Sequence, residues 1–309
     1  PARSTTRRRV PAPPRRRWRA PVLIAVAMLV ALVAALAVPA AVDRAEERAA
    51  PVAFNPGLII SDYNFFNPSA MTEEEIQAFL EARTCSPADS SSCLWEYRES
   101  TTAQPNQGSG HCTRYAAARN EPASRIIAKV ARACTISPRV LLVLMQKEQS
   151  LITRPTASGY LRATGYACPD TADCDARYFG FFNQVYRAAW QFRQYTQEPE
   201  RAYKIGTVDV GFHPDAACGA EPVGIQNQAT ANLYNYTPYQ PNSALLARPG
   251  TDGDSCSAFG NLNFWRFYTR WFGSTDTEPF PSYLDQCLNL AGGQACEEPN
   301  FFARLSPLR

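Results

Sequence analysis

LLVLMQKEQSLI, residues 141–152, is an apolar run with helical spacing, and Glu148 lies inside its apolar face. At 100° per residue, four apolar residues share the helical arc of Glu148: Leu141, Leu144, Met145 and Ile152. An unpaired carboxylate buried in this way costs several kcal/mol unless it is neutralised or hydrogen-bonded. The stretch therefore predicts both a core helix and a special role for its glutamate.

Two explanations of Glu148 remain open at the sequence level. In the first, the carboxylate forms a buried ion pair, with Arg125, Lys129, Arg162 or Arg177 as the partner. In the second, apolar surroundings keep the carboxyl protonated near neutral pH, so that it can act as a general acid. Glycosidic cleavage needs such a group, because the leaving oxygen must receive a proton as the bond breaks.

Helical patterns dominate the rest of the chain. Thr72 and Glu75 form a capping box before the stripe of a helix over 71–83. Ser137 is the expected N-cap of the central helix, which begins at Pro138. Further helices are predicted over 122–134, 138–152, 181–195, 223–236 and 261–272. Strand alternation is scarce, so we expect a mostly α fold.

The N-terminal segment has the pattern of a membrane-targeting signal. Residues 1–20 hold eight arginines and no acid, and residues 21–42 carry no charge. We expect a basic cytoplasmic arm at 1–20 and a transmembrane signal anchor at 21–42, which places the rest of the chain outside the membrane. Cleavage of a signal peptide near Ala40 is the alternative, and it gives a secreted protein.

The exported part divides by composition into four segments. We expect a stalk at 43–56, an N-terminal accessory segment at 57–111, the main helical domain at 112–273 and an irregular C-terminal extension at 274–309. Without the eight arginines of the arm, the net charge changes from +3 to −5, so nucleic acid is not an expected partner.

All ten cysteines follow the apolar segment, and an even number on the exported side indicates disulfides. Pairing of neighbours along the chain is expected: 85 with 93, 112 with 134, 168 with 174, 218 with 256, and 287 with 296. There is no CxxC pair to suggest zinc or redox chemistry, and neither a metal nor a cofactor is expected.

Five stretches carry a resemblance to a known family: LIISDYNFFNPSAMTEEEIQAFL, ISPRVLLVLMQKEQSLIT, ATGYACPD, YFGFFNQVYRAAWQF and YNYTPYQPN. Together they resemble secreted actinobacterial proteins often labelled hemagglutinin-like, whose core is similar to the lysozyme-like superfamily. The resemblance covers roughly residues 54–273. It implies a lysozyme-like helical domain at 112–273, stapled by disulfides.

The resemblance also implies site residues. Glu148 with Ser150 is similar to the catalytic glutamate and following serine of soluble lytic transglycosylases and goose-type lysozymes, although Gln149 intervenes here. Asn183 and Gln184 end a turn similar to one that lines the sugar cleft, and Tyr236 matches a tyrosine that faces the glutamate. For all three, capping or packing is the competing explanation.

A loop between two cysteines adds two further candidates. Tyr166 precedes Cys168, and Asp170 lies between Cys168 and Cys174. A two-acid mechanism requires a second carboxylate, for which Asp170 is the candidate, whereas a substrate-assisted mechanism does not. Aspartates in such loops also cap turns.

The resemblance implies a cell-wall glycan hydrolase or lytic transglycosylase that cleaves the β-1,4 bond between amino sugars of peptidoglycan. Glu148 would be the acid, and Tyr236, Asn183 and Gln184 would position the sugar. Two other classes remain open: a non-catalytic, lectin-like wall-binding module, and an envelope scaffold in which Glu148 holds a buried arginine.

Overall fold

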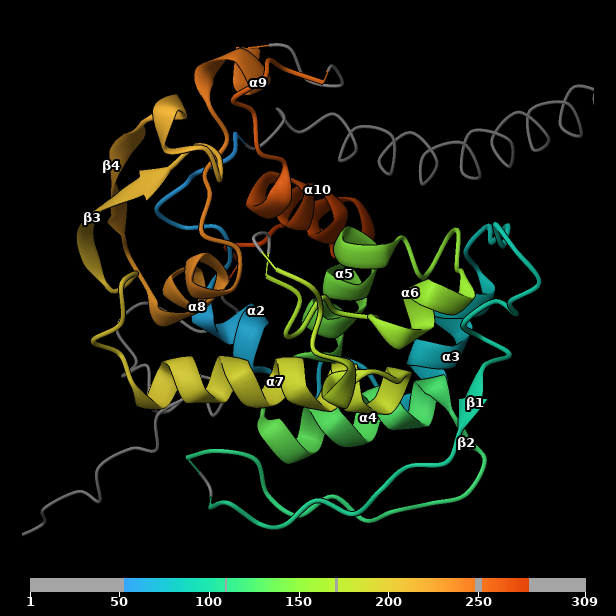
Figure 1. Cartoon of the computed structure of the whole chain (residues 1–309). Helices are drawn as coiled ribbons and strands as arrows, with labels where there is room; N and C mark the ends of the chain where they lie inside the picture. The colour runs from blue at the N-terminus through green and yellow to red at the C-terminus, as the bar shows by residue number, and fades with distance from the viewer. Residues whose placement is uncertain (1–52, 109, 170–171, 248–251, 278–309) are drawn as a thin grey trace, which may run out of the picture. The chain divides into compact units, whose positions relative to one another are not determined.

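A computed structural model of the chain describes residues 53–108, 110–169, 172–247 and 252–277 (Figure 1). The chain divides into two units, Pro1–Ala53 and Phe54–Arg309, and the elements below belong to the second. No helix among the described residues is both long enough and apolar enough to cross a membrane. The expected anchor at 21–42 and the expected pair of Cys287 and Cys296 lie outside the described residues.

The second unit is mostly helical, as predicted. Its α-helices are α2 (Asp62–Phe66), α3 (Glu73–Glu81), α4 (Ala123–Cys134), α5 (Pro138–Gln149), α6 (Ala157–Leu161), α7 (Phe181–Gln197), α8 (Gln228–Tyr236), α9 (Ser243–Ala247) and α10 (Gly260–Phe272). Two 3-10 turns, η1 (Ala176–Tyr178) and η2 (Ala216–Cys218), lie between them. Antiparallel pairs join β1 (Arg98–Glu99) to β2 (Glu121–Pro122), and β3 (Gly206–Gly211) to β4 (Ala220–Ile225).

The helices pack around α5, which lies at the centre of the fold (Figure 1). Helix α10 packs on α5, α4 packs on both α5 and α7, and α8 packs on α7. Residues from Ile59 to Tyr268 share one hydrophobic core, so the segments 57–111 and 112–273 both contribute to it. The domain boundary between these segments stays a prediction.

Local sequence explains where two of the helices begin. The predicted capping box of α3 is present: the Glu75 amide donates to Thr72 Oγ1 at 3.2 Å, and the Thr72 amide donates to Glu75 Oε2 at 2.8 Å. At α5, Pro138 begins the helix as expected, but the Ser137 side chain makes no capping hydrogen bond. Ser137 is fully buried and its amide donates instead to the Phe65 carbonyl at 2.8 Å.

Helix α5 ends three residues earlier than predicted. Ser150 adopts a left-handed conformation, with φ of 51°, and reverses the chain. Buried Gln146 holds this turn: its Nε2 donates to Thr153 Oγ1 at 2.9 Å and its Oε1 accepts from the Ile152 amide at 3.2 Å. The apolar pattern continues past the helix end because Ile152 is buried by the reversed chain rather than by another helical turn.

The helix predicted over 223–236 is wrong in its first part. Residues up to Ile225 form β4, which pairs with β3 in the register Gly206 to Ile225. Helix α8 begins only after Asn227, whose Oδ1 accepts from the Thr230 amide at 3.1 Å. A short hairpin therefore lies beside the helices, and the last three residues of its second strand, 223–225, fall where the sequence pattern predicted helix.

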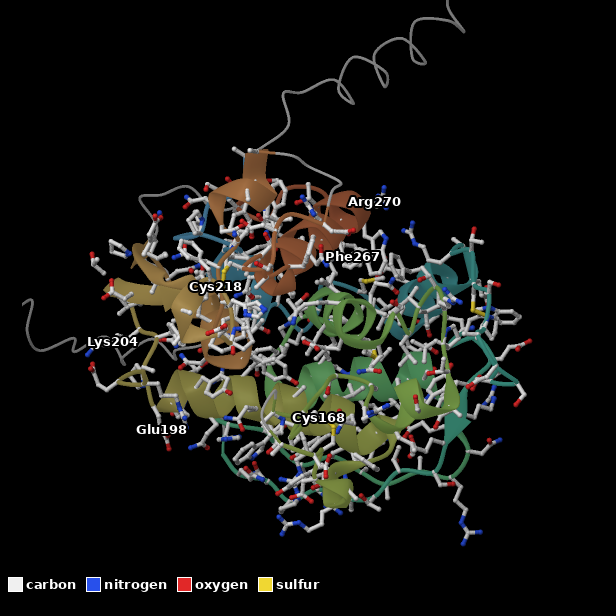
Figure 2. The ribbon with its side chains drawn as sticks, turned by 45° about the horizontal axis from the view of Figure 1, so that its top comes forward. Cys168, Glu198, Lys204, Cys218, Phe267 and Arg270 are labelled. Atoms are coloured by element: carbon white, nitrogen blue, oxygen red, sulfur yellow. A yellow bond between two sulfur atoms is a disulfide. The ribbon has the colours of Figure 1, made fainter. Side chains whose placement is uncertain are left out.

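Four of the expected disulfides are confirmed: Cys85–Cys93, Cys112–Cys134, Cys168–Cys174 and Cys218–Cys256. Cys168 and Cys218 are labelled in Figure 2. Cys168–Cys174 closes the loop before α7, and Cys218–Cys256 joins the β3–β4 hairpin to the segment before α10.

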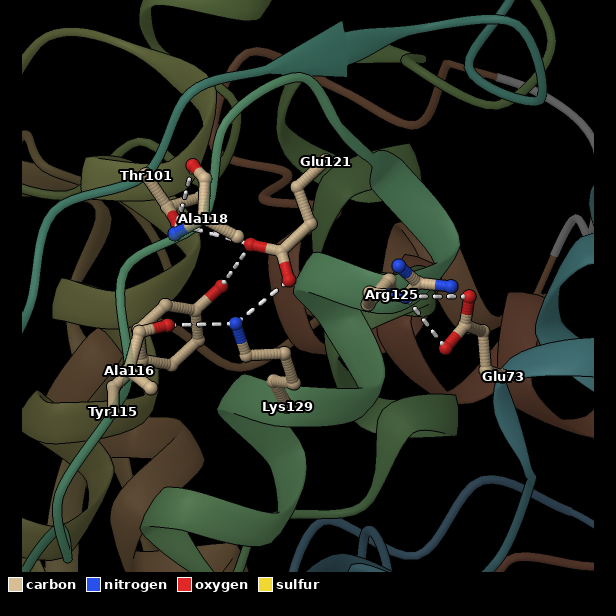
Figure 3. A network of polar contacts seen from close by, with 8 residues as sticks. All are labelled: Glu73, Thr101, Tyr115, Ala116, Ala118, Glu121, Arg125 and Lys129. Atoms are coloured by element: carbon tan, nitrogen blue, oxygen red, sulfur yellow. Dashed lines mark hydrogen bonds and ion pairs between the residues drawn. The ribbon is translucent and has the colours of Figure 1, made fainter.

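A fully buried, ion-paired carboxylate does exist in the fold, and it is that of Glu121 (Figure 3). The Glu121 side chain is 1% exposed and accepts from Lys129 Nζ at 2.6 Å. Its other oxygen accepts from Thr101 Oγ1 and from the Tyr115 hydroxyl, each at 2.9 Å. Since Lys129 also donates to the Ala116 carbonyl at 2.7 Å, this network anchors the segment between β1 and β2 on α4.

Candidate functional site

Glu148 lies on the last turn of α5, beside a second charged residue. Its side chain is 24% exposed, whereas that of Lys147 is only 7% exposed. Lys147 Nζ donates to Glu148 Oε1 and, at 2.9 Å, to Thr237 Oγ1. Glu148 Oε2 accepts no hydrogen bond from a described residue. One carboxylate oxygen is therefore tied to a cation, while the other is available.

None of the four cations expected beside Glu148 is its partner. Arg125 pairs with Glu73, Lys129 with Glu121 and Arg177 with Asp175. Arg162 donates to the Ser158 carbonyl at 3.5 Å. The surroundings of Glu148 also differ from the apolar pocket expected for a carboxyl kept neutral by burial, because the Lys147 ammonium lies against it.

The loop after α6 approaches the free side of this carboxylate. Gly165 has a φ of 70°, and a Cβ at this position would lie 3.1 Å from Glu148 Oε2. Glycine adopts this left-handed conformation at no steric cost, and it leaves room for the carboxylate. The backbone at Gly165 therefore forms one side of the site.

Gln184, on the first turn of α7, holds this loop from beneath. Its fully buried side-chain Oε1 accepts from the amides of Thr164, at 3.3 Å, and Tyr166, at 3.1 Å. Its Nε2 donates to the carbonyls of Tyr166, at 3.0 Å, and Tyr178, at 2.8 Å. Because the side-chain amide forms its hydrogen bonds inside the protein, Gln184 positions the loop. The expected contact of Gln184 with sugar stays a prediction.

Tyr236 ends α8 on the opposite side of the loop. Its hydroxyl donates to the Thr164 carbonyl at 2.8 Å, and its ring lies 4.9 Å from that of Phe192, centroid to centroid. Burial raises the pKa of the Tyr236 hydroxyl well above its ordinary value, and the charge of nearby Glu148 adds to this effect. Tyr236 is therefore a neutral hydroxyl that fixes the Thr164–Gly165 backbone beside Glu148.

Glu148 and Tyr236 line a cavity of about 570 Å³. Five segments build it: the end of α5, the loop at 165–169, the β3–β4 hairpin, the end of α8, and the start of α10. Its remaining lining residues are Lys147, Gly165, Cys168, Pro169, His213, Pro214, Thr237, Pro238, Tyr239, Ser257, Ala258, Phe259, Gly260 and Asn263. A second cavity, of about 400 Å³, shares Gly165, Cys168, Pro169 and Tyr236 with the first, so the two adjoin.

The other predicted site residues are dispersed. Tyr166 lines the second cavity, with its ring edge-on to Tyr178. Burial raises the pKa of the Tyr166 hydroxyl. Asn183 donates to the Arg177 carbonyl at 3.1 Å, and Ser150 is the exposed end of α5; neither lines the two cavities. Asp170 lies outside the described residues.

Sequence reasoning missed Lys147, Gly165, His213 and Asn263. Lys147 had a signal, since it directly precedes Glu148 in the chain. Gly165 lies inside the quoted ATGYACPD stretch without a pattern that marks it. His213 and Asn263 reach the cavity through tertiary contacts that no local pattern encodes. Among the described residues, no group of three or more His, Cys, Asp or Glu is placed to hold a metal ion.

Comparison with known families gives a match. The family model of the LasA N-terminal domain matches residues 58–282, which includes both cavities. The chain belongs to the LasA N-terminal domain family. LasA is a staphylolytic peptidase, so this membership associates the chain with secreted proteins active on the cell wall.

The matched part is the N-terminal domain of the family, and no match to a hemagglutinin-like or lysozyme-like protein was found. No curated protein and no solved structure matches the chain. The lysozyme-like core thus stays an expectation, whereas membership of the LasA N-terminal domain family supports the association with the cell wall.

Proposed function

We propose that this LasA-family domain binds glycan strands of the bacterial cell wall in the cleft around Glu148 and cleaves the β-1,4 bond between their amino sugars. One observation carries the proposal. Glu148 is the only carboxylate among the described residues that line the two adjoining cavities, and none of those residues donates a hydrogen bond to its Oε2. Such a group is positioned to exchange a proton with a bound ligand.

The shape and chemistry of the cleft suit a linear polysaccharide. Two cavities that share a side offer room for neighbouring sugars of one strand. Tyr239 and Phe259 line the first cavity, and Tyr166 and Tyr195 line the second. Aromatic rings supply apolar area against sugar faces, and tyrosine adds a polar end.

A substrate-assisted reaction needs only the one carboxylate that the described residues place in the two cavities. Glu148, once protonated, gives its proton to the glycosidic oxygen as the bond from that oxygen to C1 breaks. The 6-hydroxyl of the same sugar then attacks C1 and returns its proton to Glu148, which leaves a 1,6-anhydro end. This route needs no second acid, whereas inverting and retaining hydrolysis both do. Tyr236 positions the backbone beside the reacting carboxyl.

A non-catalytic wall-binding module is the second candidate, and the Lys147–Glu148 pair favours it. A carboxylate balanced by a mostly buried ammonium suits hydrogen bonding to sugar hydroxyls better than proton donation. The binding module and the enzyme share the cleft but differ in whether the bond breaks.

The test incubates the full-length, oxidised protein with purified peptidoglycan and analyses released fragments by mass spectrometry. Wild type, Glu148→Gln and Glu96→Gln are compared; Glu96 is an exposed glutamate outside both cavities and serves as the matched control. Binding to insoluble peptidoglycan and a thermal melt are measured for each variant. The thermal melts show whether a variant releases no fragments simply because it is unfolded.

If the protein is the proposed enzyme, wild type and Glu96→Gln release anhydro fragments. Glu148→Gln releases none but still binds peptidoglycan. Fragments with ordinary reducing ends would replace the substrate-assisted route with hydrolysis. Binding by all three proteins without fragments would establish the wall-binding module. If none of them binds peptidoglycan, the proposed function is wrong.

A further inference from the structure

The β3–β4 hairpin and the start of α10 form the second side of the cleft. Several contacts hold the hairpin in place. The Gln240 amide donates to the Gly211 carbonyl at 2.9 Å, and Gln240 Nε2 donates to the carbonyls of Val210, at 2.9 Å, and Glu221, at 3.0 Å. The Cys218–Cys256 disulfide joins the hairpin to the segment before α10. The hairpin is therefore a fixed side of the cleft.

His213 lines the cavity from this hairpin in a defined tautomer. Its Nδ1 accepts a hydrogen bond from the Asp215 amide at 3.1 Å. A neutral imidazole that accepts at Nδ1 carries its proton on Nε2. Nε2 makes no hydrogen bond with a described residue, so it is a free donor on a ring that lines the cavity.

Asn263, on the first turns of α10, lines the same cavity. Its backbone amide donates to the Phe259 carbonyl at 2.6 Å, but its side-chain amide makes no hydrogen bond with a described residue. A carboxamide offers both a donor and an acceptor. Two partly buried polar side chains on one side of the cleft thus have unused hydrogen-bonding capacity.

We infer that His213 and Asn263 recognise the acetamido group of an N-acetylated amino sugar. His213 Nε2 donates to the acetamido carbonyl, and the Asn263 side-chain oxygen accepts from the acetamido N–H. The inference rests on the proposed function, since it specifies which sugar the glycan cleft selects. A neutral sugar with a hydroxyl in place of the acetamido group leaves one or both of these side chains unpaired, which lowers its affinity.

The experiment measures binding by calorimetry in the full-length Glu148→Gln protein, so that no cleavage interferes. The ligands are the β-1,4 tetramers of N-acetylglucosamine and of glucose, which are both neutral. His213→Phe, Asn263→Leu and the near-isosteric Asn263→Asp are introduced separately into this protein. Asp209→Asn is the matched control, because Asp209 is exposed on β3 and outside the cavity.

We expect the acetylated tetramer to bind at least about tenfold more tightly than the glucose tetramer. His213→Phe and Asn263→Leu should each remove most of this preference, while Asp209→Asn keeps it. Asn263→Asp retains the acceptor and should keep more of the preference than Asn263→Leu. Equal affinities for the two tetramers, or a preference that survives both His213→Phe and Asn263→Leu, would overturn the inference.

Failure of the proposed function and failure of this inference can be distinguished. If wild type releases no peptidoglycan fragments but the acetamido preference depends on His213 and Asn263, the catalytic part of the proposed function fails and the recognition stands. If fragments are released but the preference does not depend on these residues, the enzyme stands and this inference is wrong.

Discussion

Gly165 is the residue on which the geometry around Glu148 depends most directly. Its left-handed backbone, with φ of 70°, brings the loop to the free oxygen of the carboxylate. Gln184 and Tyr236 hold the same stretch from two other elements through buried or partly buried hydrogen bonds. The site is thus defined by backbone position as much as by its charged side chains.

We expect Gly165→Ala to damage function more than stability. The left-handed backbone strains any other residue, at a cost of about 1 kcal/mol, and the new Cβ would lie 3.1 Å from Glu148 Oε2, which must shift. Gly273→Ala is the matched control, because Gly273 has a φ of 86° and open space around its Cβ position. Thermal melts and peptidoglycan binding are measured for both variants. Equal losses of binding would show that strain alone acts and that the contact with Glu148 is unimportant.

At the scale of elements, the segment between β1 and β2 is held on α4 by polar contacts. Burial opposes ionisation of Glu121, but the hydrogen bonds from Lys129, Tyr115 and Thr101 outweigh it, and the pKa of Glu121 lies below its ordinary value. The unfolded chain therefore takes up this proton at a higher pH than the folded one. The stability that Glu121 contributes is present above about pH 4.5 and is lost as the pH falls through the folded-state pKa.

Glu121→Gln should lower the free energy of unfolding at neutral pH by about 3 kcal/mol, because Lys129 loses its buried counter-charge. It should also flatten the decline of stability below about pH 4.5. Glu73→Gln, which breaks the more exposed pair with Arg125, should cost less than about 1 kcal/mol. Denaturant unfolding across a pH series measures both. A Glu121→Gln protein as stable as wild type at neutral pH would contradict this account.

The elements also show how much of the fold and of the site could be predicted from the sequence. Helices α3, α4, α5, α7 and α10 were predictable because their apolar periodicity is local, and the capping box of α3 is local as well. The β3–β4 hairpin was missed although Val223 and Ile225 have the two-residue spacing of a strand, because the run is too short to fix the structure without its pairing with β3. Glu148 was found from its place on an apolar helical face and Tyr236 by resemblance, and the structure brings both to one cavity. Lys147 and Gly165 required the tertiary fold.

At the scale of the whole molecule, the helical core and the cleft are stabilised by different means. Residues from Ile59 to Tyr268 form the shared apolar core, in which α5 is buried. The hairpin on the other side of the cleft has mostly exposed strands, with Val210, Val223 and Ile225 as its buried residues. It therefore depends on the Gln240 hydrogen bonds and on Cys218–Cys256 more than on apolar packing.

Removal of Cys218–Cys256 should therefore impair both stability and ligand binding. Its half-cystines are 38 residues apart, so the chain-entropy argument gives a loss of about 4 kcal/mol for the paired Cys→Ser variant. The pair Cys85–Cys93, 8 residues apart, should cost about 2.5 kcal/mol and lies outside both cavities. Denaturant unfolding and binding of the N-acetylglucosamine tetramer distinguish the two. We expect weaker binding only in the Cys218→Ser/Cys256→Ser protein, because only there does the side of the cleft that carries His213 lose its covalent tie. Unchanged affinity in that protein would mean that the hairpin is held by its hydrogen bonds alone.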